Sequence, residues 1–321
     1  MNTQIDFPVP SAADIRQAAG RIKAHVHQTP VLQSRQLNEM FGLKMLFKCE
    51  NFQKAGAFKS RGAVNAVFSL KEKDLEKGVC THSSGNHAQA LARAAALRNC
   101  RAYIVMPETS PKVKVDAVRQ YGGTISFCEP NLAARESKLK EIQEKTGAIE
   151  IHPYNNLSII AAQATAALEV FSQCPQPDVI MAPVGGGGLL SGTALATHYF
   201  SSTTRVMAAE PAGADDAYRS FHQRKFIPSR DPKTIADGLL TSLGSFTFPV
   251  ILEYVDDIHR VQEDSIISAM KLIWERMKIV IEPSSAVVLA AIMENPEIFR
   301  GKTVAMILSG GNIDLNKIPW V

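Results

Sequence analysis

The chain has 321 residues, of which 45% are hydrophobic and 21% are charged. This is the composition of an ordinary globular protein, and it excludes a disordered, collagen-like or coiled-coil chain. At about 150 residues per domain, the length predicts two domains or lobes. The net charge is +4, from 35 basic and 31 acidic residues. Because this excess is small and no dense run of Lys or Arg occurs, we expect no nucleic-acid partner.

Cysteine usage and apolar runs indicate the compartment. The five cysteines are an odd number at wide spacings, and none forms a C-x-x-C pair, which argues against a disulfide framework or a zinc site. The first twenty residues lack the apolar stretch of a signal peptide. The longest apolar run, Ala286 to Met293, falls well short of the ~20 residues that span a bilayer. We therefore expect a soluble cytoplasmic protein without a membrane partner.

Short apolar runs alternate along the chain with Ala-rich or amphipathic stretches. The pattern predicts strands at 78–81, 102–106, 124–128, 179–184, 205–209 and 304–308, and helices at 88–98, 112–121, 135–145 and 189–199. Continuous apolar strands that alternate with helices are typical of parallel sheets covered on both faces. The predicted fold class is therefore α/β. Ligands of such sheets lie at the carboxyl ends of the strands, where Gly- and Ser-rich loops follow here.

The first motif in the chain is a lysine next to an aromatic residue, in the stretch Gly56–Ala57–Phe58–Lys59–Ser60–Arg61–Gly62. A lone lysine is usually a solvated surface charge. A lysine held beside Phe58 would instead lose hydration, which lowers the pKa of its amine and frees it for Schiff-base chemistry. Lys59 is therefore a candidate nucleophile.

A second motif, Ser83–Ser84–Gly85–Asn86–His87, follows the strand predicted at 78–81. Hydroxyl groups, a glycine turn and exposed backbone N–H groups before a helix suit a carboxylate or a ring hydroxyl. The alternative is a capped helix start without a ligand. His82 and His87 are five residues apart, a spacing that does not suit a two-histidine metal site on a helix face.

Four consecutive glycines, Gly185 to Gly188, open a helix after the strand predicted at 179–184. Backbone N–H groups there can face an anion, to which the helix dipole adds attraction, so a phosphate is the natural ligand. A turn without a ligand is the alternative. The G-K-[ST] of a P-loop is absent. A dinucleotide fingerprint is nearly complete, with Ser191 in place of the third glycine and Glu210 about 20 residues on, so an NAD-dependent oxidoreductase is the competing class of enzyme.

The last motif, Leu308–Ser309–Gly310–Gly311–Asn312, by itself indicates only a turn. The four motifs together, in this order, resemble the fold type II pyridoxal-phosphate enzymes, the family of serine racemase and the serine/threonine dehydratases. The resemblance extends from about Ile15 to Asp314, and the stretch Thr81–His87 is similar to the racemase version in particular. It implies a tryptophan synthase β-like fold with two parallel-sheet lobes. The large cofactor-binding lobe would comprise residues 1–75 and 154–321, and a small mobile lobe residues 76–153.

The resemblance also implies a role for each motif residue. Lys59 would bind pyridoxal 5′-phosphate covalently and then act as the base at Cα, with Ser84 as the second base on the opposite face. Arg135 and Ser242 would approach the distal carboxylate of a dicarboxylic substrate, although a solvated helix charge is the alternative for Arg135. The implied cofactor contacts are Phe58, Lys59, Asn86, Gly185, Gly186, Gly187, Gly188, Leu189 and Ser309, and the implied substrate contacts are Ser83, Ser84, Asn86, His87, Arg135 and Ser242.

A divalent cation and a homodimer are implied as well. The carboxylates of Glu210 and Asp216 and the carbonyl of Ala214 match the metal loop of the family. Oxygen ligands suit Mg²⁺, and also Mn²⁺ or Ca²⁺. The alternative is an acidic loop that only caps a helix.

The function that these expectations describe is a deaminating dehydratase. It would remove water from L-serine or L-threonine and release a keto acid and ammonia, with serine racemisation as a second activity. L-threo-3-hydroxyaspartate, which would give oxaloacetate, is the alternative substrate. A non-catalytic amino-acid or nucleotide binder of the same fold would keep the glycines but have no need of Lys59.

Overall fold

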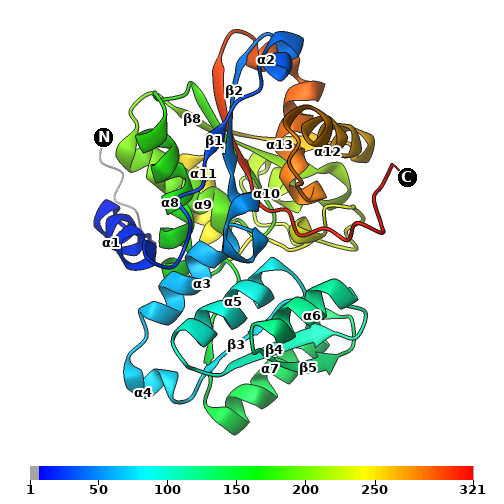
Figure 1. Ribbon diagram of the computed structural model, residues 1–321. Helices are drawn as coiled ribbons and strands as arrows, with labels where there is room; N and C mark the ends of the chain where they lie inside the picture. The colour runs from blue at the N-terminus through cyan, green and yellow to red at the C-terminus, as the bar shows by residue number, and fades with distance from the viewer. Residues whose placement is uncertain (1–6, 321) are drawn as a thin grey trace.

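The computed structural model describes residues 7–320, which form two connected α/β parts around separate sheets (Figure 1). The larger sheet contains, in spatial order, β1 (Val31–Leu32), β2 (Lys44–Cys49), β10 (Thr303–Leu308), β7 (Val179–Pro183), β8 (Arg205–Pro211) and β9 (Asp257–Val261). The smaller sheet contains β5 (Thr124–Cys128), β4 (Ala102–Pro107), β3 (Val79–His82) and β6 (Ile149–Glu150). Every strand pair is parallel except β1–β2. The predicted α/β class with parallel sheets is therefore confirmed.

Helices cover both faces of each sheet. The α-helices are α1 (Ala12–Ile22), α2 (Arg35–Phe41), α3 (Lys59–Phe68), α4 (Glu72–Leu75), α5 (Asn86–Leu97), α6 (Lys112–Gln120), α7 (Leu132–Thr146), α8 (Leu157–Gln173), α9 (Gly188–Phe200), α10 (Asp216–His222), α11 (Thr247–Tyr254), α12 (Glu263–Met277), α13 (Pro283–Glu294) and α14 (Pro296–Phe299). Four 3-10 turns are η1 (Glu50–Phe52), η2 (Lys54–Gly56), η3 (Ala212–Ala214) and η4 (Asp237–Leu239). Apolar side chains of α12 and α13 fill one face of the larger sheet, and those of α1, α8, α9 and α11 fill the other.

The predicted strands and helices are all present, with small differences at their ends. The largest difference is at α7, which begins at Leu132 rather than at 135. The reason is Asn131, whose side chain accepts a hydrogen bond from the backbone N–H of Ala134 at 2.7 Å and so caps the helix earlier. Central strands such as β7 are buried at every residue, as expected for strands covered on both sides.

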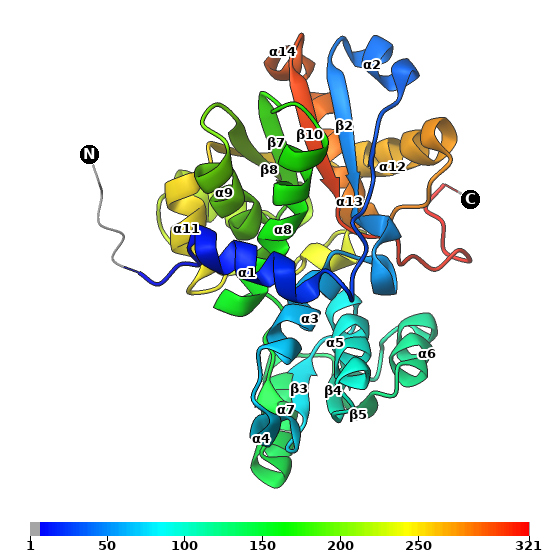
Figure 2. The same cartoon turned by 60° about the vertical axis from the view of Figure 1, so that its left-hand side comes forward.

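The smaller sheet lies within residues 79–150, while strands from both sides of this segment build the larger sheet. Figures 1 and 2 both show α3 at the boundary between the two parts. Residues 1–6 and 321, which we assigned to the large lobe, lie outside the described residues. Movement of the smaller part relative to the larger one stays a prediction.

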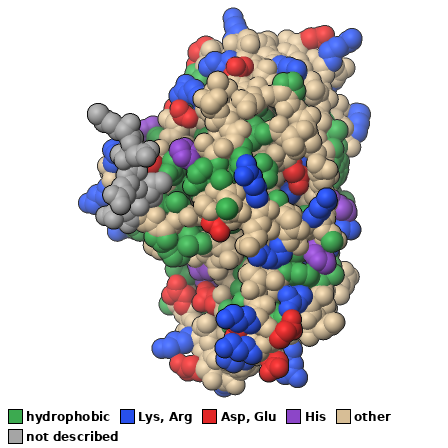
Figure 3. All heavy atoms as spheres, turned by 90° about the vertical axis from the view of Figure 1, so that its left-hand side faces the viewer, with side chains coloured by type: hydrophobic (Ala, Val, Ile, Leu, Met, Phe, Trp, Pro, Cys, Tyr) green, Lys and Arg blue, Asp and Glu red, His purple; other side chains and the backbone are tan. Residues whose placement is uncertain are grey.

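Over residues 7–320, no helix combines the length and the apolar character needed to cross a bilayer. On the face shown in Figure 3, basic and acidic side chains are intermixed rather than separated into patches of one sign. Three of the four motifs lie at the carboxyl ends of parallel strands. Helices α5 and α9 begin just after β3 and β7, and Ser309 follows β10 directly.

Candidate active site

Lys59 is the first residue of α3, at the boundary between the two sheets. Its Nζ donates a hydrogen bond to the carbonyl oxygen of Pro153 at 2.7 Å and lies 5.1 Å from the centroid of the Phe58 ring. Burial lowers the pKa of Lys59 to about 8, although the nearby Glu282 carboxylate opposes this change. An amine with this pKa is partly neutral near pH 7 and can act as a nucleophile or a base.

The Ser83–Ser84–Gly85 loop connects β3 to α5 next to Lys59. The backbone N–H of Ser83 bonds to the carbonyl of Val105 at 3.1 Å, which fixes the loop to the smaller sheet. At the other end of the loop, Nε2 of His87 lies 2.8 Å from the carbonyl oxygen of Ile151. Ile151 is only two residues before Pro153, so the loop and Lys59 meet at one chain segment.

The ring of His87 is buried and neutral. Burial, together with the charge of Lys59, lowers its pKa to about 3. Because Nε2 donates its proton to the carbonyl of Ile151, Nδ1 carries a lone pair, and Nδ1 has no hydrogen-bond partner among residues 7–320. The ring therefore has no proton to offer a substrate carboxylate, and only the backbone N–H of His87 is available for the contact that we expected.

The tetraglycine turn leaves no room for side chains. A Cβ atom at Gly186 would lie 2.3 Å from the ring of Tyr154, and Gly187 has φ of +88°. The turn opens α9, a helix of 13 residues with no side-chain cap at its N-terminus. Its first N–H groups are therefore available to an anion, which fits the phosphate of the expected cofactor.

Asn86 begins α5 and is held by Glu282, which the sequence analysis missed, and by Asn312 of the last motif. Its Nδ2 donates to both carboxylate oxygens of Glu282, at 2.8 and 3.1 Å, and its Oδ1 accepts from Nδ2 of Asn312 at 2.9 Å. Burial, with a smaller contribution from Asp237, raises the pKa of Glu282 to about 7. No sequence signal marks Glu282, because a glutamate before Pro283 is an ordinary start of a helix.

Ser309 follows β10 and is buried. Its hydroxyl oxygen lies 3.1 Å from that of Ser285, which also bonds to the backbone of Gly310. The carbonyl of Ser309 accepts a hydrogen bond from the N–H of Phe58 at 3.0 Å. The first and the last motif of the sequence are thus neighbours in space. The hydroxyl of Ser309 is a donor of the kind that the nitrogen of a pyridine ring would accept from.

The two residues expected at the distal end of a substrate lie on different parts of the molecule. Arg135 is on α7, where its Nε is buried and has no hydrogen-bond partner among the described residues. Burial and the charge of Arg135 together lower the pKa of His82, the residue just before the Ser83 loop. Ser242 lies between η4 and α11, and its hydroxyl accepts the N–H of Ser229 at 2.8 Å.

The acidic loop after β8 contains two buried carboxylates. Both oxygens of Asp216 are buried without a hydrogen-bond partner within residues 7–320, and burial raises the pKa of Asp216 to about 6. Burial and the charge of Asp216 raise the pKa of Glu210 well above its usual range. Two unneutralised carboxylates beside the Ala214 turn fit a divalent cation with oxygen ligands.

The same geometry argues against a dinucleotide site. In a dinucleotide fold, the acidic residue in the position of Glu210 bonds to a ribose. Here the carboxylate of Glu210 accepts hydrogen bonds from the backbone N–H groups of Ala217 and Tyr218, at 3.1 and 2.7 Å. The carboxylate is therefore turned toward the start of α10, next to Asp216, rather than toward a ribose at the glycine turn.

The chain is similar in sequence and structure to several known proteins. The beta-hydroxyaspartate dehydratase of Paracoccus denitrificans is 49% identical over 97% of this chain and 99% of its own length. A serine racemase of Dictyostelium discoideum is 51% identical over 96% of each chain. The crystal structure of a T.th. threonine deaminase has a TM-score of 0.91 and 41% identity, and the match covers 95% of this chain and 99% of the other. The fold is therefore that of the fold type II enzymes.

A protein family described as "Pyridoxal-phosphate dependent enzyme" matches residues 22–310. This range includes the first three motifs in full and the fourth as far as Gly310. The family match and the two relatives agree with the buried lysine and the glycine turn. The chain belongs to the family of pyridoxal-phosphate-dependent enzymes.

Proposed function

We propose that this enzyme removes water from L-serine and L-threonine, releasing a keto acid and ammonia, and that it also racemises serine. The observation that carries the proposal is the position of the Lys59 amine. It is held by Pro153 on the segment that also fixes the Ser83–His87 loop, so a base and a carboxylate-binding loop share one site. Relatives that are a serine racemase and a threonine deaminase support it.

Bound in this site, pyridoxal phosphate supplies the electron sink that makes the Cα proton of an amino acid acidic. Asn86, Ser309 and the glycine turn would hold it. The chain's own residues then orient the substrate and move the proton. Backbone N–H groups at the start of α5 bind the substrate carboxylate, and the Lys59 amine takes the Cα proton. Its pKa near 8 lets it accept this proton and return it near neutral pH.

Racemisation needs a second group on the opposite face of Cα. The resemblance assigns this role to Ser84, which lies in the loop just before Asn86. A proton removed by Lys59 and replaced from Ser84 inverts the amino acid, whereas elimination needs Lys59 and departure of the β-hydroxyl. One site thus performs both reactions.

The proposal is tested by the release of keto acid from purified, cofactor-loaded protein with L-serine, L-threonine and L-threo-3-hydroxyaspartate at equal concentration. The matched control is Lys59→Ala, examined by borohydride reduction. Turnover by the wild-type protein and loss of the reducible covalent cofactor in Lys59→Ala support the proposal. Covalent cofactor retained by Lys59→Ala contradicts it.

A second candidate substrate is L-threo-3-hydroxyaspartate. One observation favours it: the buried Nε of Arg135 lacks a partner among residues 7–320 and lies in the neighbourhood of His82, at the entry to the Ser83 loop. Although Arg135 as a whole is only half-buried, its buried Nε–H donor without a partner is costly, and a second substrate carboxylate would satisfy it. The beta-hydroxyaspartate dehydratase among the relatives supports this substrate.

We further propose that Mg²⁺, or Mn²⁺ or Ca²⁺ in its place, binds the Glu210 and Asp216 carboxylates and the Ala214 carbonyl. The support is the pair of buried carboxylates described above. The cation would neutralise them and stabilise the loop. Its addition to chelated protein should raise the melting temperature.

A homodimer is also proposed. Phe52 and Val280 are 42% and 44% exposed, and they lie close together because Asn51 donates a hydrogen bond to the Val280 carbonyl at 3.0 Å. Exposed apolar side chains of this kind suit a subunit interface. Light scattering on the purified wild-type protein, compared with the Val280→Glu variant, tests the assembly.

A cytoplasmic location rests on the sparse, unpaired cysteines and stays a prediction.

A further inference from the structure

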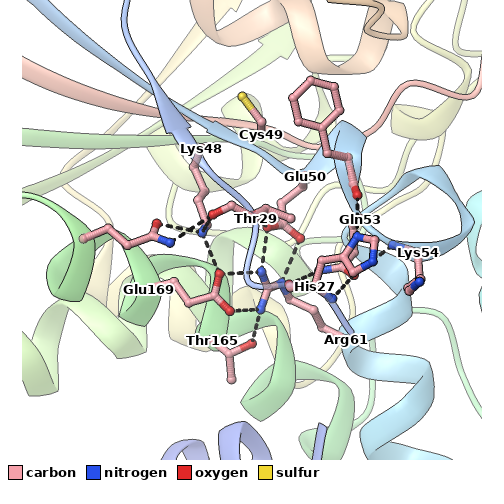
Figure 4. A network of polar contacts seen from close by, with 12 residues as sticks. His27, Thr29, Lys48, Cys49, Glu50, Gln53, Lys54, Arg61, Thr165 and Glu169 are labelled. Atoms are coloured by element: carbon pink, nitrogen blue, oxygen red, sulfur yellow. Dashed lines mark hydrogen bonds and ion pairs between the residues drawn. The ribbon is translucent and has the colours of Figure 1, made fainter. Parts of the chain in front are cut away.

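Two residues after Lys59, the side chain of Arg61 is fully buried in a network of charges (Figure 4). Its Nε and Nη2 donate to the two carboxylate oxygens of Glu50, both at 2.8 Å. Its Nη1 and Nη2 donate to the two oxygens of Glu169, at 2.6 and 2.8 Å, and Nη1 also reaches Thr165 at 3.2 Å. One guanidinium thus joins α3 to η1 on one side and to α8 on the other.

Helix α3 also packs very closely on α8. A Cβ atom at Gly62 would lie 2.4 Å from Nε2 of Gln163, so the contact leaves no room for a side chain on α3. One turn further along, Nδ2 of Asn65 donates to the carbonyl of Ser158 at 2.7 Å. Arg61, Gly62 and Asn65 therefore determine where α3 lies on α8.

The position of α8 matters for Lys59 because Pro153 precedes α8 by only four residues. The turn between them is fixed by Asn156, whose side chain caps α8 by accepting the N–H groups of Ser158 and Ile159, at 2.9 and 3.2 Å. Pro153 in turn accepts the hydrogen bond from Lys59. A rotation or shift of α3 on α8 would therefore change the distance between the Lys59 amine and its only acceptor within residues 7–320.

We propose that Arg61 is a positioning residue for Lys59. Its two bidentate contacts fix the rotation and the axial position of the first turn of α3, and thereby hold the Lys59 amine against Pro153. Apolar side chains alone define such a position poorly, because apolar contacts are not directional, whereas paired N–H···O bonds to a carboxylate are. A buried ion pair is moreover weak evidence for stability, since apolar replacements are often as stable. This inference rests on the role of Lys59 in the proposed function.

The test is Arg61→Lys, which keeps the charge but loses the planar fork. The first readout uses the apo-protein: the rate of covalent capture of pyridoxal phosphate is followed by absorbance as a function of pH. For the wild-type protein we expect a midpoint near pH 8, the pKa of Lys59. For Arg61→Lys we expect capture at least about tenfold slower and a midpoint about one unit higher, because a displaced amine regains water. In the loaded enzyme, kcat should fall at least about tenfold while KM changes less than about threefold.

Lys48 provides the matched control inside the same network. Its ammonium group donates to Glu169 at 2.6 Å, to the Thr29 carbonyl at 2.6 Å and to Gln173 at 3.1 Å, and none of these residues is on α3. Lys48→Met leaves all the bonds of Arg61 to Glu50 and Glu169 in place, although it removes one partner of Glu169. It should therefore lower the melting temperature while changing the capture midpoint and kcat far less than Arg61→Lys does.

If Arg61→Lys does not fold, Thr165→Val replaces it, because this substitution removes one of the hydrogen bonds of Arg61 and nearly keeps the side-chain volume. It also removes the bond from the Thr165 hydroxyl to the Ala162 carbonyl, which lies within α8. It should shift the midpoint in the same direction by a smaller amount. The inference is overturned if the tested variant loses stability but changes the capture midpoint and kcat no more than Lys48→Met does. If no amino acid is turned over, the proposed function fails, while a shifted capture midpoint would still support the role of Arg61.

Discussion

Lys114 and Asp237 form an ion pair that joins the two parts of the molecule. Lys114 is on α6 beside the smaller sheet, and Asp237 is in η4, next to the glycine turn at the end of β7. The Lys114 side chain is only 11% exposed, and its Nζ lies 4.0 Å from the position of a Cβ at Gly85, in the loop before Asn86. The pair therefore connects the part of the chain next to this loop with the part next to the glycine turn.

The first prediction concerns this pair. Because it connects the two parts, Lys114→Met or Asp237→Asn should favour a more open site and raise KM about two- to fivefold, which corresponds to ~0.5–1 kcal/mol for a partly exposed ion pair. The exchange variant Lys114→Asp/Asp237→Lys should restore most of the loss. Kinetics at low and high salt measure the effect, and KM values that do not respond to the exchange would show that the pair has no part in closure.

The second prediction separates the two bases. Ser84→Ala should reduce racemisation of serine by at least about a hundredfold, since a positioned acid or base contributes roughly 10²–10⁴-fold. Dehydration, which uses Lys59, should stay within a few-fold of the wild-type rate. Chiral chromatography for D-serine and a pyruvate assay on the same reaction give the two rates. Equal losses in both reactions would mean that Ser84 only shapes the site.

The third prediction concerns the distal carboxylate. Arg135→Met should lower kcat/KM for L-threo-3-hydroxyaspartate about 10- to 100-fold, because a hydrogen-bonded charge contributes about 1.5–3 kcal/mol. The value for L-serine should not change, since serine has no second carboxylate. Lys140→Met is the matched control, because Lys140 is on the same helix and its side chain is 77% exposed. If both substrates lose activity equally, Arg135 has no role in selecting dicarboxylates.

The parts of the site that the sequence revealed are those with a local pattern. Lys59 lies beside an aromatic residue and glycines, and Gly185 to Gly188 join a buried strand to a helix. Such patterns are readable because the conformation they require, a glycine turn or an open helix start, depends on neighbouring residues in one short segment. The strands were predictable for a similar reason, because residues of a covered parallel strand must all be apolar.

The parts that the sequence did not reveal are pairs of residues far apart in the chain. Glu282 is 196 residues from Asn86, and Pro153 is 94 residues from Lys59. A single glutamate or a carbonyl group has no sequence signature, and its partner is determined only when the sheets and helices are packed. The same holds for Arg61. It lies in the motif that identifies Lys59, but its own partner Glu169 is 108 residues away in the sequence.

The last prediction concerns pH and the cation. Burial raises the pKa of Asp216 from 3.8 to about 6, so between these values the folded state keeps a proton that the unfolded state has lost. The contribution of Asp216 to the stability of the chelated protein should therefore be largest below about pH 4. It should fall as the pH rises from about 4 through about 6. The loss is on the order of 3 kcal/mol, because each pKa unit corresponds to about 1.4 kcal/mol. A raised pKa of Glu210 acts in the same direction.

Added Mg²⁺ should remove most of this loss, because the cation favours the ionised carboxylates. Asp216→Asn should reduce the decline with pH to the part that Glu210 contributes, and should remove most of the response to Mg²⁺. Thermal melts of chelated and Mg²⁺-loaded protein from about pH 4 to 7 give the comparison, because the loss falls between the two pKa values of Asp216. Asp215→Asn is the control for a neighbouring carboxylate that is paired with Arg219 and Arg260. If chelated wild-type protein and Asp216→Asn show the same pH dependence, the Asp216 carboxylate is not the titrating group and the proposed cation site is wrong.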